Sequence, residues 1–141
     1  MISYPTVILD TNILISALIS SGSSSKIIDM LINDEFLHIT SQNILKEVES
    51  VGRRDKFRHY FSLQTFKKFL LIINQTSTIV IPAPTIPLQY QSIDTSDNIF
   101  IATILESNPD FFITGNIKHF THIKTLTHVI SPAEFIKKHT N

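Results

Sequence analysis

Residues 5–16 contain the stretch that most limits how this chain can fold. Val7, Ile8 and Leu9 form a short continuous apolar run, which is typical of a strand buried on both faces of a parallel sheet. Asp10 ends the run, and two helix-capping residue types follow it before apolar residues recur at helical spacing. The carboxyl ends of strands are where open α/β sheets bind ligands, although an aspartate at this point can also simply cap the helix.

The rest of the chain alternates between the two kinds of pattern. Apolar spacing and capping residues predict strands over 36–40, 78–81, 111–113 and 129–130, and helices over 26–33, 42–51, 62–75, 97–107 and 132–138. Serines around a glycine predict a loop over 20–25, and three prolines predict an extended loop over 82–87. This alternation predicts an α/β fold with a mainly parallel sheet and helices on both sides. At 141 residues, we expect a single domain spanning 1–141.

Composition limits the partners and the cellular compartment of this protein more than it limits its activity. The chain has 12 basic and 12 acidic residues, so a nucleic acid or membrane would have to be met by a local patch. It has no cysteine, which excludes disulfides and cysteine-based zinc sites and makes the cytoplasm the expected localisation. No run approaches the roughly 20 apolar residues that a membrane span needs, so no membrane association is expected.

Five residues with oxygen side chains stand at comparable points of the predicted fold: Asp10, Glu47, Asp94, Asp97 and Asn116. The first and last directly follow predicted strands, and Asp94 and Asp97 lie before and at the start of a helix. Carboxylates and waters are the ligands that Mg²⁺ and Mn²⁺ prefer. Such ions can clamp a phosphodiester during its displacement, so phosphate-ester hydrolysis is the reaction class that suits this set.

Each of these residues also has an ordinary structural explanation. Asp97 can offset the helix dipole, Asp94 can stabilise a turn, and Asn116 belongs to a common turn composition. Glu47 lies at one edge of the apolar stripe of its helix, while Glu49 lies nearly as close to the opposite edge. Helical geometry alone therefore does not choose between the two glutamates.

Five segments resemble the motifs of a known family, both in their residues and in their order along the chain. They are Ile8-Leu9-Asp10-Thr11-Asn12, Ser41 followed by Glu47, Asp94-Thr-Ser-Asp97-Asn98, Ile113-Thr114-Gly115-Asn116, and Ser131-Pro-Ala-Glu-Phe135. With them the chain resembles the PIN-domain family over nearly its whole length. The similarity is greatest to the branch that comprises toxin components of bacterial toxin–antitoxin pairs. The resemblance implies a three-layer α/β/α sandwich and a metal-dependent endoribonuclease that hydrolyses RNA.

The resemblance also implies residue roles. The acidic ligands of Mg²⁺ or Mn²⁺ would be Asp10, Glu47 and Asp97, and Asp94 matches an acidic position often found just before the last of these. Polar groups supporting the site would be Thr11, Asn12 and Thr114. Family members commonly form homodimers, and the toxic ones are held by a cognate antitoxin protein, so both are expected partners beside RNA.

One position departs from the family pattern. The turn after the strand at 111–113 usually carries an aspartate, and here Asn116 stands in its place as a catalytic and metal-binding candidate. An amide keeps an oxygen donor but loses a unit of charge, which predicts one tight and one weak metal site. The alternative is a metal-poor PIN-like module that binds RNA or a protein without cleaving. A receiver-like signalling domain is disfavoured because Asp10 has no acidic neighbour in sequence.

Residues 53–68 are locally basic and are the candidate nucleic-acid interface. Arg53, Arg54, Lys56 and Arg58 can hold RNA phosphates, with an aromatic residue, Tyr60, available for stacking. A solvated basic helix face is an equally ordinary explanation. The six histidines form no metal-binding spacing. Lys118 and His119 lie near Asn116 and can assist substrate binding, although a surface role is the favoured explanation.

Overall fold

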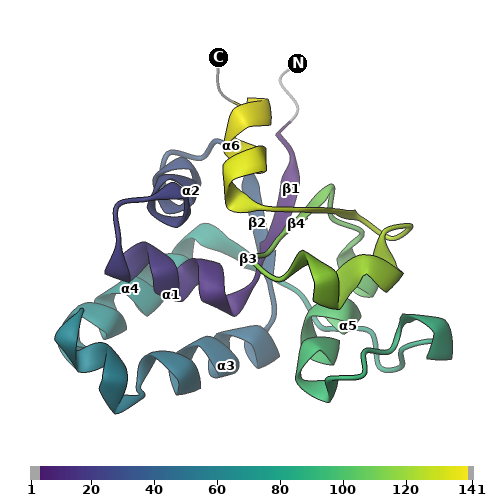
Figure 1. Cartoon of the computed structure of the whole chain (residues 1–141), viewed down its shortest axis with the longest axis horizontal. Helices are drawn as coiled ribbons and strands as arrows, with labels where there is room; N and C mark the ends of the chain where they lie inside the picture. The colour runs from purple at the N-terminus through teal and green to yellow at the C-terminus, as the bar shows by residue number, and fades with distance from the viewer. Residues whose placement is uncertain (1–3, 140–141) are drawn as a thin grey trace.

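The computed structural model describes residues 4–139 of the chain. In this part of the chain, five strands form one sheet in the order β3-β2-β1-β4-β5, and every pair of neighbours is parallel (Figure 1). The strands are β1 (Thr6–Leu9), β2 (Leu37–Thr40), β3 (Ser77–Ile79), β4 (Phe111–Ile113) and β5 (His128–Ile130). The predicted α/β fold with a parallel sheet is confirmed.

Helices flank this sheet. The α-helices are α1 (Thr11–Ile19), α2 (Ser23–Ile32), α3 (Gln42–Gly52), α4 (Leu63–Thr76), α5 (Asn98–Ser107) and α6 (Pro132–His139). Short 3₁₀ turns are η1 (Asp55–His59), η2 (Leu88–Tyr90), η3 (Thr95–Asp97) and η4 (Ile117–Ile123). Helix α1 packs against α2 and α3, and α6 packs against α2. No helix in the described part combines the length and apolar character that crossing a membrane requires.

The strand order reverses at β1. The chain passes from β1 outward to β2 and β3, and then returns to place β4 on the other side of β1. The register pairs Leu9 with Ile113, so the carboxyl ends of β1 and β4 lie level with each other. A crevice at such a reversal is where open α/β sheets bind ligands.

An aromatic cluster holds the segment after β4 against the core. Phe112 of β4 and Phe120 of η4 are both buried, and their ring centroids lie 4.7 Å apart in an edge-to-face arrangement. Phe100 of α5 lies against both rings, at 5.7 Å and 6.5 Å. Because edge-to-face pairs add to the hydrophobic gain of burial, η4 is fixed beside the start of α5.

Two stretches differ from the sequence expectation. Residues 20–25 were expected to form a loop, but α2 begins at Ser23 with Gly22 as its N-cap. Serine and glycine are tolerated at helix starts, so this composition also fits a capped first turn. Turn η4 was not predicted, because its residues lack a clear apolar period and its helical geometry is interrupted at Phe120.

Candidate active site

Asp10 lies directly after β1, in extended conformation at the N-cap position of α1. Its side chain makes no capping hydrogen bond and is only 7% exposed. Instead, the Thr114 hydroxyl donates to Asp10 Oδ2 at 2.6 Å, and the backbone N–H of Asn116 donates to the same threonine oxygen at 2.9 Å. Thr114 therefore links the turn after β4 to the carboxylate after β1.

Helix α3 brings a glutamate to the same place. The hydroxyl of Thr11, at the start of α1, donates to Glu47 Oε2. Glu49 lies elsewhere on α3, where its carboxylate pairs with Arg53 at 3.6 Å on the surface. The structure thus separates the two glutamates between which the helical pattern could not choose, and it places Glu47 beside Asp10.

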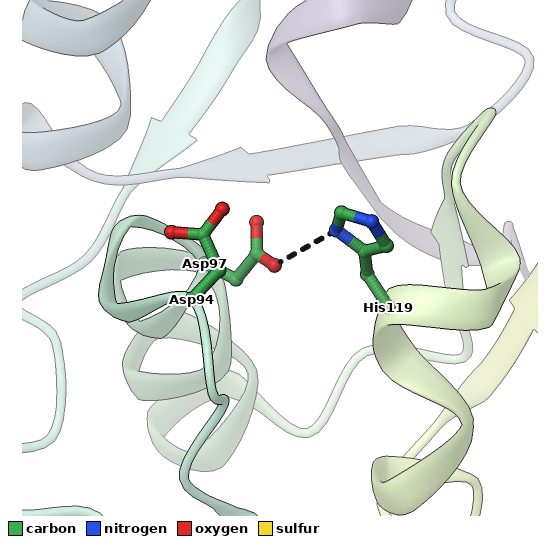
Figure 2. A group of neighbouring side chains, drawn as sticks. All are labelled: Asp94, Asp97 and His119. Carbon is green, nitrogen blue, oxygen red and sulfur yellow. Dashed lines mark hydrogen bonds and ion pairs between the residues drawn. The ribbon is translucent and has the colours of Figure 1, made fainter.

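The start of α5 supplies two more carboxylates, which Figure 2 shows together with a histidine from η4. Asp94 Oδ1 accepts hydrogen bonds from the Ser96 backbone N–H at 3.0 Å and from its hydroxyl at 2.7 Å. Asp97 Oδ2 lies 3.2 Å from His119 Nδ1. One ligand atom from each of Asp94, Asp97 and His119 lies within 4.8 Å of the others.

These groups line one pocket of about 200 Å³ at the carboxyl ends of β1 and β4. Its lining contains seven predicted site residues: Asp10, Thr11, Asn12, Glu47, Asp94, Asp97 and Asn116. Thr114, the eighth, is fully buried behind Asp10. The structure therefore brings the predicted set together, while the role of each residue stays a prediction.

His119 also lines this pocket, although the sequence favoured a surface role for it over assistance in substrate binding. Its place depends on η4, which folds back toward α5 because Phe120 is buried against Phe100 and Phe112. The only signal in the sequence was its nearness to Asn116. That signal does not reveal the direction in which the chain turns after β4.

Burial and mutual repulsion act on the carboxylates. Burial raises the pKa of Asp10; the hydrogen bond from Thr114 and the backbone of Thr11 oppose this rise, and the charges of Glu47 and Asp97 add to it. Burial also raises the pKa of Asp97, against the lowering effect of its hydrogen bond with His119. Converging carboxylates of this kind are stabilised by a cation.

The donor set fits a hard divalent cation. Carboxylate oxygens are the preferred ligands of Mg²⁺ and Mn²⁺, and an imidazole is compatible with the transition metals. Asp94 remains available on the rim because it is exposed, and the two hydrogen bonds from Ser96 lower the pKa of its carboxyl. The pocket can thus present oxygen ligands from the end of β1, from α3 and from the start of α5 to one ion.

The predicted nucleic-acid residues lie beyond the end of α3, outside the acidic pocket. Val51, near the end of α3, lines that pocket, and the exposed side chains of Arg53, Arg54 and Lys56 follow it. Arg58 differs from them: its Nη2 donates to the Gly52 carbonyl oxygen, and its Nε and Nη1 are buried. Arg53, Arg54 and Lys56 are therefore exposed cations on the segment that follows α3, while the guanidinium of Arg58 packs inward.

Together, the all-parallel sheet and the acidic pocket at its strand-order reversal define an α/β protein with a candidate divalent-metal site. Comparison with known proteins identifies the class: residues 6–118 match the PIN domain, and the chain belongs to that family. An uncharacterized protein of the archaeon Methanocaldococcus jannaschii is 33% identical over 112 residues, covering 78% of this chain and 70% of that protein. PIN domains are generally metal-dependent nucleases that act on RNA.

Proposed function

We propose that this protein is a Mg²⁺- or Mn²⁺-dependent endoribonuclease that hydrolyses phosphodiester bonds of RNA. The observation that carries the proposal is the convergence of Asp10, Glu47, Asp94 and Asp97 on one pocket at the carboxyl ends of β1 and β4. Carboxylates gathered around one pocket repel one another in the absence of a cation, and Asp10 is buried as well. A divalent cation bound there supplies Lewis-acid activation of the phosphodiester and of water.

The surrounding residues prepare the site for such an ion. Asp10, Glu47 and Asp97 are its proposed ligands, and Asn116 contributes a weaker, neutral oxygen from the turn after β4. Hydroxyl donors hold two of the carboxylates in place, since Thr114 donates to Asp10 and Thr11 donates to Glu47. Groups that orient ligands in this way sharpen both the geometry and the affinity of a metal site.

RNA would reach the pocket across the end of α3. Arg53, Arg54 and Lys56 are the proposed contacts to backbone phosphates; their exposure and their position in sequence just after Val51 of the pocket lining support this role. Tyr60, 59% exposed, offers a ring for base stacking on the same segment. Arg58 is proposed to position this segment rather than to bind phosphate, because its guanidinium packs inward against the end of α3.

The proposal includes a biological setting: a cytoplasmic toxin held by a cognate antitoxin, with homodimer formation. It is supported by the motif resemblance, and growth measurements test it directly. Induced expression of the wild-type chain should arrest a bacterial host, and Asp10→Ala should restore growth at equal protein level. Normal growth with soluble, active wild-type protein would contradict the toxin role while leaving the nuclease intact.

A second candidate function is favoured by Asn116. An amide at this position removes one negative charge from the pocket, which weakens a second metal site and favours a module that binds RNA or a protein without cleaving. Asn116→Asp tests this reading, because the added carboxylate should raise Mn²⁺ affinity by about tenfold. Isothermal titration calorimetry measures the change, and unchanged affinity would argue against any metal role for this position.

The decisive experiment for the nuclease is cleavage of a mixed RNA pool with Mn²⁺, with Mg²⁺ and with chelator. Asp10→Ala and Asp97→Asn should abolish cleavage, because each removes a proposed ligand. Asp29→Asn, on the exposed face of α2, is the matched control and should cleave like wild type. Absence of cleavage by folded wild-type protein in either metal would overturn the proposal in favour of the binding-only candidate.

A further inference from the structure

A larger cavity lies against the acidic pocket. It measures about 590 Å³, within the usual range for small-molecule sites. Asp94, Asp97 and His119, which Figure 2 draws, line both cavities, and we refer to these three residues as the shared wall. A ligand in the larger cavity would therefore lie next to the groups proposed to hold the metal.

The outer wall of this cavity is the segment that leads from β3 to α5, and it is fastened at several points. The Ala83 N–H donates to the Ala102 carbonyl of α5 at 3.0 Å. Further along, the Ser92 N–H donates to Asn98 Oδ1 at 2.9 Å. These bonds hold the segment against α5, so the cavity is built into the fold.

Turn η4 closes the other side. His122 Nε2 lies 3.0 Å from the Tyr90 carbonyl oxygen. Because a carbonyl oxygen only accepts, Nε2 is the donor in this contact. The contact joins η4 to the segment opposite and places the His122 ring in the lining of the cavity.

Away from the shared wall, the lining combines apolar surface with polar side chains and contains no acidic residue. Gln89 and Ser92 offer an amide and a hydroxyl, and Lys118 offers an ammonium. Ile93 adds a fully exposed apolar side chain at the mouth. Neutral donors and acceptors beside one apolar surface suit the edge and face of a nucleobase, and an ammonium suits a phosphate.

We propose that this cavity binds one unstacked nucleotide of the RNA substrate and reads its base next to the bond that is cut. The inference rests on the proposed nuclease function for the position of that bond. The base packs on Ile93 and hydrogen-bonds to Gln89 and Ser92, while Lys118 contacts a flanking phosphate. The protein then selects the identity of one base, the base beside the bond that is cut.

Binding can be tested where no cleavage takes place. The four nucleoside 5′-monophosphates are titrated into ¹⁵N-labelled protein in chelator. At least one should shift the backbone amide signals of residues 89–93 and of η4. Gln89→Ala and Ile93→Ala should each weaken that binding by about tenfold through loss of a hydrogen bond or an apolar contact. Gln75→Ala and Ile81→Ala, exposed residues outside the cavity, are the matched controls and should bind like wild type.

A second measurement separates this proposal from the nuclease itself. Sequencing the ends of RNA cut in Mn²⁺ should show one preferred base beside the cut, and Gln89→Ala and Ile93→Ala should flatten that preference. Nucleotide binding at residues 89–93 without any RNA cleavage would refute the nuclease and support the cavity. Metal-dependent cleavage without these shifts, or with an unchanged base preference in both variants, would refute the cavity and support the nuclease.

Discussion

A buried histidine on β2 predicts how the stability of this protein depends on pH. His38 is 2% exposed, and its Nδ1 lies 2.6 Å from the Ser77 hydroxyl oxygen. Within residues 4–139 its Nε2 finds no hydrogen-bond partner. Burial therefore favours the neutral ring and lowers the pKa of His38 from 6.5 to about 4.

The magnitude follows from the two pKa values. Between pH 6.5 and 4 the unfolded chain binds a proton at His38 that the folded chain does not, so unfolding is favoured by acid in this window. Each pH unit is worth about 1.4 kcal/mol, and the interval of 2.5 units therefore costs about 3 kcal/mol of unfolding free energy. This contribution is fully present above pH 6.5 and lost as the pH falls to about 4.

Urea denaturation in chelator measures the effect between pH 6.5 and 5.5, and comparison of wild type with a variant that lacks the imidazole cancels the contribution of the carboxylates. From the linkage relation, His38 alone removes about 1 kcal/mol over that unit. His38→Asn keeps an amide near the serine hydroxyl but cannot titrate, so its stability should fall by about 1 kcal/mol less than that of wild type. His59→Asn, at an exposed residue of η1, should behave like wild type. Equal pH dependence in His38→Asn and wild type would refute the burial of a neutral ring.

Three further predictions concern the site and its support. Asp10→Asn should raise the unfolding free energy in chelator, because burial raises the pKa of Asp10 and its ionised form costs stability at neutral pH. In thermal denaturation, Mn²⁺ at a hundred times its Kd should stabilise wild type by about 2.7 kcal/mol and should stabilise Asp10→Asn much less. Thr114→Val should weaken Mn²⁺ binding by about 10–100-fold in calorimetry, because it removes the hydroxyl that holds Asp10; unchanged affinity would contradict that role. Gly52→Ala should cost about 3 kcal/mol or more in urea denaturation, because its Cβ would lie 2.0 Å from Phe66, whereas Gly115→Ala meets nothing within 4 Å and should stay within about 0.5 kcal/mol of wild type.

The strands and helices could be predicted from the sequence because burial requires apolar residues in a local pattern. Val7–Leu9 is a continuous apolar run since β1 is covered on both faces, and its residues are fully buried. Asp10 stands out because it interrupts such a run. No local sequence pattern indicates that β4 pairs with β1, because about a hundred residues separate the two strands and only their packing decides the strand order of the sheet.

The site was predictable to the extent that its residues follow strands or begin helices. Asp10 and Asp97 were found in this way, and both lie in the acidic pocket. Glu47 needed the contact with Thr11 to distinguish it from Glu49, and that contact joins two helices. The position of His119 in the acidic pocket was not predicted, because it follows from the packing of aromatic rings around η4.

The hydrogen bonds around the pocket show how the fold tolerates so much negative charge in one place. Each of the four carboxylates has its own donor: Thr114 for Asp10, Thr11 for Glu47, Ser96 for Asp94 and His119 for Asp97. Three of these donors are hydroxyls, which stabilise an anion without neutralising it. The carboxylates are thus held in position while most of their charge remains uncompensated. A fold in which these carboxylates bound no ligand would gain by pairing them with lysine or arginine, so this arrangement is better explained by a site kept ready for a cation.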